Sequence, residues 1–345
     1  MSSTTAPFAA RVRWTVLALA AVLALGAAVR GPGEAAQPEA GKKRVAVVLS
    51  VGGLGDRSFN DMAYEGLQAA RRDLGVIGVY GEPAAMSEDE RYLDFYAEQG
   101  FDLVFAIGFL MKSALESAAK RHPGTSFAII DEQVDLPNVA SVRFREHEGC
   151  YLVGALASRA SKTGTVGIVL GMDVPLLRVF EHGWNQGVAA GRPGGTSHTM
   201  VANSFADPVR GKELTRVLVR QGADVVFQAA GQTGNGVITG AAEEKILAVG
   251  CDANQNGEAP GTVLTSMLKR VDVAVLELCR EVVEGRFRPG AHSLGVKEGA
   301  IGWALDANNR GLVSADDEAW LRGLEAKIRS GELVVTSEAP KGGGK

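Results

Sequence analysis

An internal repeat is the feature of this sequence that most constrains its fold. The apolar segment VAVVLS, which begins at Val45, matches the segment VGIVLG, which begins at Val166. In both copies a phenylalanine that is expected to open a helix follows 14 residues after the first valine, at Phe59 and at Phe180. Two copies of one pattern at the same spacing predict two lobes of similar structure.

Later landmarks of the repeat keep the same register. The run FDLVFAIG corresponds to ADVVFQAAG, which aligns Phe105 with Phe227, and FAIID, ending at Asp131, corresponds to LAVGCD, ending at Asp252. Continuous Val- and Leu-rich runs are typical of strands that are buried on both faces of a parallel sheet. Because these runs alternate with helical patterns, we predict two similar doubly wound α/β lobes.

The repeat also predicts where a ligand would bind. In open parallel sheets, ligands bind beyond the carboxyl ends of the strands, and two facing lobes form a cleft between them. Phe59, Asp131, Phe227 and Asp252 all fall at or just past expected strand ends, so we interpret them as cleft residues. Two alternatives stay open: the phenylalanines pack under their loops, and the aspartates cap helices.

Each lobe is expected to take two segments of the chain. We assign residues 44–142 plus 266–296 to the first lobe and residues 143–265 plus 297–335 to the second. The hinges are expected where the chain crosses between lobes, near residues 141–145, 261–266 and 295–303.

Residues 1–36 are expected to form an export signal and a linker. Arg11 and Arg13 precede an apolar run from Trp14 to Val29, and small residues follow, which is typical of a secretory signal peptide. An uncleaved anchor helix is the alternative, although the run is short for about 30 Å of hydrocarbon. No cysteine stands next to this run. We therefore expect a periplasmic or otherwise extracytoplasmic protein without a lipid attachment site.

The composition excludes several kinds of function. The formal net charge is −4 and there are no basic runs, which argues against nucleic acid as a partner. The five histidines show no metal-ligand spacing, and no Gly-x-Ser-x-Gly motif is present. The sequence therefore predicts neither a metal site nor a cofactor, and it names no catalytic residue.

Two other patterns are candidate sites. The loop GQTGNG, which begins at Gly231, lacks the Lys-Ser/Thr ending of a phosphate loop, so we interpret it as a glycine-rich turn close to a ligand or to another backbone. Cys150, Cys251 and Cys279 match no metal site and are interpreted as small buried residues, with one disulfide left open.

The remaining candidates are suited to binding a small molecule. A base that stacks on an aromatic ring gains about 1–3 kcal/mol, and carboxylates accept hydrogen bonds from sugar hydroxyls or ring N–H groups. Lys269 follows an expected strand and could hold a hydroxyl or orient a carboxylate, with an ordinary surface charge as the alternative.

Five segments resemble the basic membrane protein family of ABC-transporter substrate-binding proteins, and within it the purine nucleoside receptor type. They are VVLSVGGLGDRSFNDMAYEGL, GIVLGMDVPLLRVFEHGW, DVVFQAAGQTGNGVI, GCDANQ and VLTSMLKRVDVAV. The resemblance covers about residues 44–309 and implies a periplasmic-binding-protein type I fold, with two hinged lobes that close on a ligand. It also implies delivery of that ligand to an ABC permease in the inner membrane.

By this resemblance, Phe59 and Phe227 would sandwich a purine ring, and Asp131 would hydrogen-bond the base. Asp252 and Lys269 would hold the ribose hydroxyls. Asn60 would add a polar contact, and the loop at Gly231 would approach the ligand. The sequence departs from the family pattern at three positions, which are Arg57, Gln232 and Trp184.

The reading that these patterns favour is a monomeric, non-enzymatic protein that captures a nucleoside-like ligand, with a purine nucleoside expected. One alternative is a nucleoside-processing enzyme, which would need a metal-binding Asp cluster or a phosphate site that the sequence does not display. Another alternative is a ligand-sensing receptor or regulator on the same two-lobe fold. Regulators of that kind carry a helix-turn-helix ahead of the core, whereas this chain begins with the expected export signal.

Overall fold

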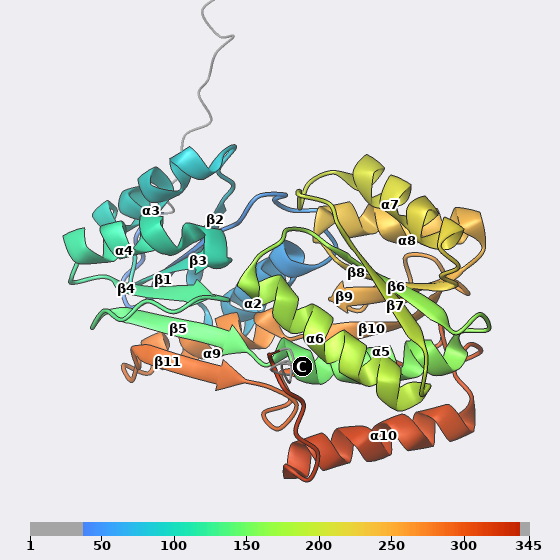
Figure 1. Cartoon of the computed structure of the whole chain (residues 1–345). Helices are drawn as coiled ribbons and strands as arrows, with labels where there is room; N and C mark the ends of the chain where they lie inside the picture. Colours follow the sequence, from blue (N-terminus) through green and yellow to red (C-terminus); the bar gives the residue numbers. More distant parts are fainter. Residues whose placement is uncertain (1–36, 339–345) are drawn as a thin grey trace, which may run out of the picture. The chain divides into compact units, whose positions relative to one another are not determined.

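Two six-stranded sheets organise the chain, and Figure 1 shows the first on the left of the view and the second on the right. The computed structural model describes residues 37–338. The expected export signal, residues 1–36, lies outside the described residues. Among the helices of the described part, none is both long and apolar enough to cross a membrane.

The first sheet is parallel throughout, with the strand order β11-β5-β4-β3-β1-β2. Its strands are β1 (Arg44–Val48), β2 (Ile77–Gly81), β3 (Leu103–Ile107), β4 (Ser126–Ile130), β5 (Val139–Phe144) and β11 (Gly290–Leu294). The helices of this lobe are α2 (Phe59–Leu74), α3 (Asp89–Glu98), α4 (Lys112–Arg121) and α9 (Val271–Val283), with short 3₁₀ turns η3 (Met86–Glu88) and η4 (Phe109–Met111).

The second sheet has the order β12-β10-β9-β8-β6-β7, and only its edge strand β12 runs antiparallel. Its strands are β6 (Thr165–Leu170), β7 (Thr196–Val201), β8 (Val225–Ala229), β9 (Leu247–Asp252), β10 (Val263–Lys269) and β12 (Ile301–Trp303). Its helices are α5 (Glu146–Ala160), α6 (Pro175–Gly191), α7 (Pro208–Arg220), α8 (Gln232–Glu244) and α10 (Ala315–Ser330).

The two sheets share one topology, which confirms the predicted fold class. The order β5-β4-β3-β1-β2 in the first sheet matches β10-β9-β8-β6-β7 in the second. Strands β1, β3 and β8 are buried along their whole length, as expected for strands covered by helices on both faces. One helix start differs from the expectation: α6 begins at Pro175, so Phe180 lies in its second turn instead of opening the helix. Proline suits the first position of a helix because it has no N–H to leave unpaired there.

The chain passes between the two sheets after β5, after β10 and between β11 and β12. The first and third passages lie within or beside the expected hinge segments. The second does not, because Ser266 to Leu268 pair with Gly250 to Asp252 inside the second sheet. Residues 266–269 therefore lie in the second lobe, and the chain crosses after Lys269 instead of near 261–266.

Gly66 and Gly187 occupy corresponding positions of the repeat, seven residues after Phe59 and Phe180, and each lies where the first helix of its repeat packs against a second helix. A Cβ atom on Gly66 of α2 would be 2.5 Å from the carbonyl oxygen of Asp272 at the start of α9. A Cβ atom on Gly187 of α6 would be 2.1 Å from the carbonyl oxygen of Tyr151 in α5. Real Cβ atoms do not approach that closely, so both positions require glycine for the helices to pack at this separation.

We expect Gly187→Ala to destabilise the protein by about 1–3 kcal/mol, because its methyl group must push α5 and α6 apart. The matched control is Gly323→Ala in α10, where no atom lies within 4 Å of the added Cβ. There the same substitution should raise the free energy of unfolding by about 0.4–1 kcal/mol. Urea unfolding of both variants makes the comparison, and equal effects would contradict the packing argument.

Candidate ligand-binding site

A cavity of about 70 Å³ lies between the lobes, beyond the carboxyl ends of strands from both sheets. The first lobe lines it with Ser50, Val51, Asp56, Phe59, Asn60, Gly108, Phe109, Leu110 and Asp131. The second lobe lines it with Leu176, Leu177, Phe180, Phe205, Ala229, Ala230, Gly231, Cys251, Asp252 and Lys269. Six of the seven expected ligand-binding residues belong to this lining: Phe59, Asn60, Asp131, Gly231, Asp252 and Lys269.

Asp131 and Asp252 occupy corresponding positions of the repeat and share an unusual backbone conformation. Asp131 follows β4 with φ 71°, and Asp252 ends β9 with φ 63°. Left-handed backbone is rare outside glycine, although aspartate is among the residues that tolerate it. Both carboxylates lie at the cavity between the lobes.

The expectation for Phe227 is wrong. Its side chain is fully buried in β8, and its ring stacks on Trp184 of α6 with centroids 5.2 Å apart. Phe227 lies in the interior of its strand and packs on α6, whereas the lining residues lie at or near strand ends, in the loops beyond them or in the helices that follow. The purine sandwich between Phe59 and Phe227 is therefore not possible in this structure.

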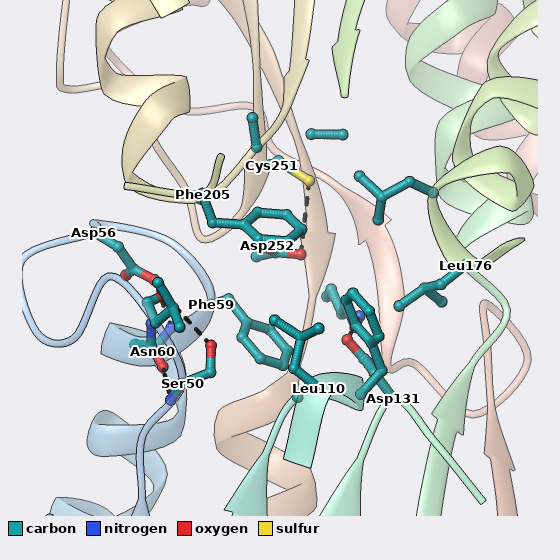
Figure 2. A pocket seen from close by; sticks show the side chains of 18 of the residues that line it. Ser50, Asp56, Phe59, Asn60, Leu110, Asp131, Leu176, Phe205, Cys251 and Asp252 are labelled. Atoms are coloured by element: carbon teal, nitrogen blue, oxygen red, sulfur yellow. Dashed lines mark hydrogen bonds and ion pairs between the residues drawn. The ribbon is translucent and has the colours of Figure 1, made fainter. Parts of the chain in front are cut away.

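Phe205 lies across the cavity from Phe59, and the two side chains project from opposite walls (Figure 2). A Cβ atom on Gly171 would be 2.2 Å from the Phe205 ring, so that glycine makes room for the ring. Phe109 of η4 meets Phe205 edge to face, with centroids 6.3 Å apart, and joins the two lobes.

Phe205 was not among the predicted site residues, although the sequence carries a signal for it. The segment Ser-Phe-x-Asp occurs at the start of a helix at residues 58–61, where α2 begins at Phe59, and just before α7 at residues 204–207. Phe59 and Phe205 are the aromatic residues of these two segments. The segment Ser-Phe-x-Asp therefore marks both residues, whereas the strand register marks only one of them.

Lys269 joins the lobes at one end of the cavity. Its Nζ lies 2.6 Å from Oδ2 of Asp131 in the first lobe and 3.0 Å from Oε1 of Glu146, the first residue of α5. Its side chain is only 2% exposed. The rings of Phe59 and Phe144 are centred 5.1 Å from the ammonium, and that of Phe180 is centred 5.7 Å away, within cation–π range.

The charges in this cluster determine how each group titrates. Burial raises the pKa of Asp131 to about 7; Lys269 acts in the opposite direction, while Glu146 and Asp252 raise the pKa further. Burial by itself lowers the pKa of Lys269, but the three carboxylates outweigh it and raise the pKa. Lys269 is therefore a stable ammonium that faces an excess of acceptor groups.

Hydrogen-bonding capacity remains on the cavity wall. Oδ1 of Asp131 is buried and has no hydrogen-bond partner among the described residues. The Oδ1 atom of Asn60 accepts the Ser50 N–H at 3.0 Å, so its amide N–H groups are the donors that it can offer. The lining thus presents aromatic faces together with a polar group of carboxylates and one bound ammonium.

Asp56 and Cys251 are two further polar residues of the lining, and we assign neither of them a role in binding a ligand. Asp56 accepts the N–H groups of Ser58, Asn60 and Asp61 and so holds the start of α2. Burial raises the pKa of Asp56 to about 6. Burial likewise raises the pKa of the Cys251 thiol well above its ordinary value, which disfavours the nucleophilic thiolate. The three cysteines are free and buried, so no disulfide forms in this structure.

Two similar lobes, three crossings and a cavity lined from both sides define a two-lobed solute-binding protein. The chain belongs to the family described as PnrA-like ABC transporter substrate-binding proteins, whose model matches residues 43–338. This membership confirms the family predicted from the sequence motifs.

Individual relatives are similar to this chain along most of their own length. The ABC transporter nucleoside-binding protein BmpA of Lactococcus lactis subsp. cremoris is 30% identical, over 86% of this chain and 89% of its own. An uncharacterized lipoprotein of Pyrococcus abyssi is 35% identical, over 88% of this chain and 86% of its own. The solved structure of an ABC transporter solute-binding protein of Aeropyrum pernix superposes with a TM-score of 0.80 at 33% identity, covering 87% of this chain and 94% of that one.

We expect Lys269→Met to lower the free energy of unfolding by about 3–5 kcal/mol, because it leaves the Asp131 and Glu146 carboxylates buried without a counter-charge. The control is Lys112→Met, which removes an exposed pair with Glu132 and should cost less than about 1 kcal/mol. Urea unfolding measures both. A loss for Lys269→Met no larger than that for Lys112→Met would contradict the assigned burial of the pair.

The raised pKa of Asp131 predicts a pH dependence of stability. The pKa of Asp131 is higher in the folded protein than in the unfolded chain, so the folded state binds this proton more tightly. The contribution of protonated Asp131 to stability is therefore fully present below about pH 4 and is lost as the pH rises through about 7. Asp131→Asn should therefore gain stability relative to the unsubstituted protein as the pH rises from 5 to 8. The slope is at most about 1.4 kcal/mol per pH unit for one proton. Urea unfolding at each pH measures the free energy of unfolding of both proteins. A difference between the two free energies that stays constant from pH 5 to 8 would contradict the prediction.

Proposed function

We propose that the protein captures a nucleoside-like solute, with purine nucleosides as the favoured class, by closing its two lobes around it. The observation that carries this proposal is the pairing of Phe59 and Phe205 on opposite walls beside a cluster of buried carboxylates. Aromatic faces suit a flat base, and carboxylates suit the hydroxyl groups of a sugar. The relative named as a nucleoside-binding protein supports the same class of ligand.

In this proposal each end of the ligand meets a different part of the lining. The base lies between Phe59 and Phe205, where stacking contributes about 1–3 kcal/mol per ring. Asp252 and Lys269 hold the ribose hydroxyls. Asp131 offers its unpartnered Oδ1 to a donor on the ligand, and Asn60 offers its amide N–H groups.

Closure around the ligand follows from the size of the cavity. Pockets that take small organic ligands measure roughly 300–1,000 Å³, several times the volume of this cavity. Entry of a nucleoside therefore requires the lobes to part, which separates Phe109 from Phe205. A ligand that contacts both walls favours the closed form by the contacts that only this form provides.

Family membership supports a role for this protein in transport. Substrate-binding proteins of ABC transporters hand their ligand to a permease, and we propose this role outside the cytoplasm for the present chain. The Pyrococcus abyssi relative is named a lipoprotein, whereas the sequence led us to expect no lipid attachment here. Mass spectrometry of the protein isolated from its native membrane fraction distinguishes a lipidated chain from a free one.

Thermal unfolding against adenosine, guanosine, inosine, ribose and a panel of amino acids tests the ligand class. A ligand that binds only the folded state stabilises it by about 2.7 kcal/mol at a hundredfold excess over its Kd. We expect nucleosides to raise the Tm and ribose to leave it unchanged. A shift with amino acids and none with nucleosides would replace the proposed ligand.

We expect Phe59→Ala and Phe205→Ala each to weaken nucleoside binding at least tenfold, because each removes one stacking face. Asp252→Ala should have an effect of similar size through the lost sugar contact. Phe95→Ala is the control, since Phe95 is a partly buried residue of α3 that lies outside the lining. Calorimetric titration measures all four variants. Normal binding by the variants of Phe59 and Phe205 would show that the base lies elsewhere.

A further inference from the structure

A second set of contacts joins the lobes beside the cavity without lining it. Arg57 and Ser58, which precede α2 in the first lobe, meet Cys251 to Glu258, at and after the end of β9 in the second. Arg57, Ser58, Gln255 and Glu258 are absent from the cavity lining. These four residues therefore join the lobes without facing the cavity themselves, although Ser58 bonds Cys251 and Asp252, which do line it.

The Ser58 hydroxyl forms its hydrogen bonds with residues of the other lobe. Ser58 occupies the N-cap position of α2, yet its side chain caps no helical N–H, because Asp56 accepts those hydrogens instead. The fully buried hydroxyl donates instead toward Oδ2 of Asp252 at 2.9 Å and the carbonyl oxygen of Cys251 at 3.0 Å. A serine in this position would ordinarily serve its own helix.

The amide of Gln255 has only one possible orientation in this network. Its Oε1 accepts the N–H groups of Gln228 at 2.7 Å and of Cys251 at 2.9 Å, both from the second lobe. Its Nε2 must then face the first lobe, where it donates to the carbonyl oxygen of Arg57 at 3.0 Å. Gln255 is 1% exposed, so water does not compete for this bond.

The receiving carbonyl is held in place by strained backbone. Arg57 has φ 54°, in the left-handed region, and its N–H is bound by Oδ2 of Asp61 at 2.9 Å. The other oxygen of Asp61 accepts the Gly55 N–H at 2.8 Å. The Arg57 guanidinium pairs with Glu258 of the second lobe. A non-glycine residue persists in this conformation only where its surroundings hold it.

We propose that Ser58 and Gln255 form a latch that holds the lobes closed from outside the ligand cavity. Ser58 also acts as a positioning residue, since its hydroxyl fixes Oδ2 of Asp252 while that carboxylate lines the cavity. The latch rests on the proposed function in one respect, which is that the lobes part to admit a ligand. Its bonds form only in the closed form, so they lengthen the lifetime of the bound state.

The latch predicts a kinetic signature. Removing one buried hydrogen bond to a charged group that forms only on closure should raise the ligand dissociation rate about tenfold. The association rate should change little, since encounter occurs with the open lobes. Loss of a residue that only stabilises one lobe would leave both rates unchanged.

Ser58→Ala is the test, with Ser158→Ala as its matched control. Ser158 is also buried, but its hydroxyl donates to the Ala155 carbonyl within α5 and not to the other lobe. The first readout uses no ligand: amide hydrogen exchange of residues 250–256, which lie in the opposite lobe from Ser58. The second is stopped-flow dissociation of inosine. We expect Ser58→Ala to speed both and Ser158→Ala to change neither.

A second variant keeps the test decisive if Ser58→Ala does not fold. Gln255→Glu keeps the Oε1 acceptor but removes the Nε2 donor to the Arg57 carbonyl oxygen, and should speed exchange of residues 56–61 in the opposite lobe. Unchanged exchange in the opposite lobe for the folded variants would overturn the latch. A fall in the association rate of inosine with unchanged dissociation would overturn it as well. If inosine does not bind, the proposed ligand fails, while the exchange measurement still decides on the latch.

Discussion

The buried ion pair between Lys269 and Asp131 is the interaction on which the arrangement of the two lobes depends. An ammonium cannot be removed from water without close counter-charges, because the desolvation cost amounts to several kcal/mol. The second lobe supplies Lys269 and Glu146, but the closer carboxylate comes from the end of β4 in the first lobe. Glu146 and Lys269 each lie beside a passage of the chain between lobes. Relative motion of the lobes that preserves this pair must therefore pivot near it.

Much of the architecture could be predicted because both copies of the repeat can be recognised from local patterns of residues. Buried parallel strands are continuous apolar runs, and their spacing revealed two copies without any knowledge of long-range contacts. The rule that ligands bind beyond strand ends located Asp131, Asp252 and Lys269 at the cavity. The rule misplaced Phe227 because the end of its strand was expected too early: β8 continues to Ala229, so Phe227 lies inside the strand and packs on Trp184. Phe105, which corresponds to Phe227 in the repeat, is likewise a core residue.

Two features could not be predicted because they depend on pairing between distant segments. The chain crosses after Lys269, and not near residue 261, because β10 continues along β9 as far as Leu268. No local pattern distinguishes the last residue of a paired strand from the first residue of a passage. Glu146 is similar: its sequence marks an ordinary acidic first turn of a helix. It becomes a partner of Lys269 only because the first and second passages lie together at the base of the cleft.

The site and the latch divide recognition from closure. A ligand shifts an equilibrium between open and closed lobes only by the difference of its affinity for the two forms. Contacts outside the cavity, such as those of Ser58 and Gln255, stabilise the closed form whatever ligand is present. They lower the differential affinity that a ligand must supply, and they do so equally for every ligand. If the protein captures its ligand as proposed, selectivity is left to Phe59, Phe205 and the carboxylates, while the lifetime of the closed form is set by the contacts beside the cavity. Asp252 belongs to both sets, since one of its oxygens holds Ser58 while its carboxylate lines the cavity, so occupation of the site and closure of the latch are coupled through this residue.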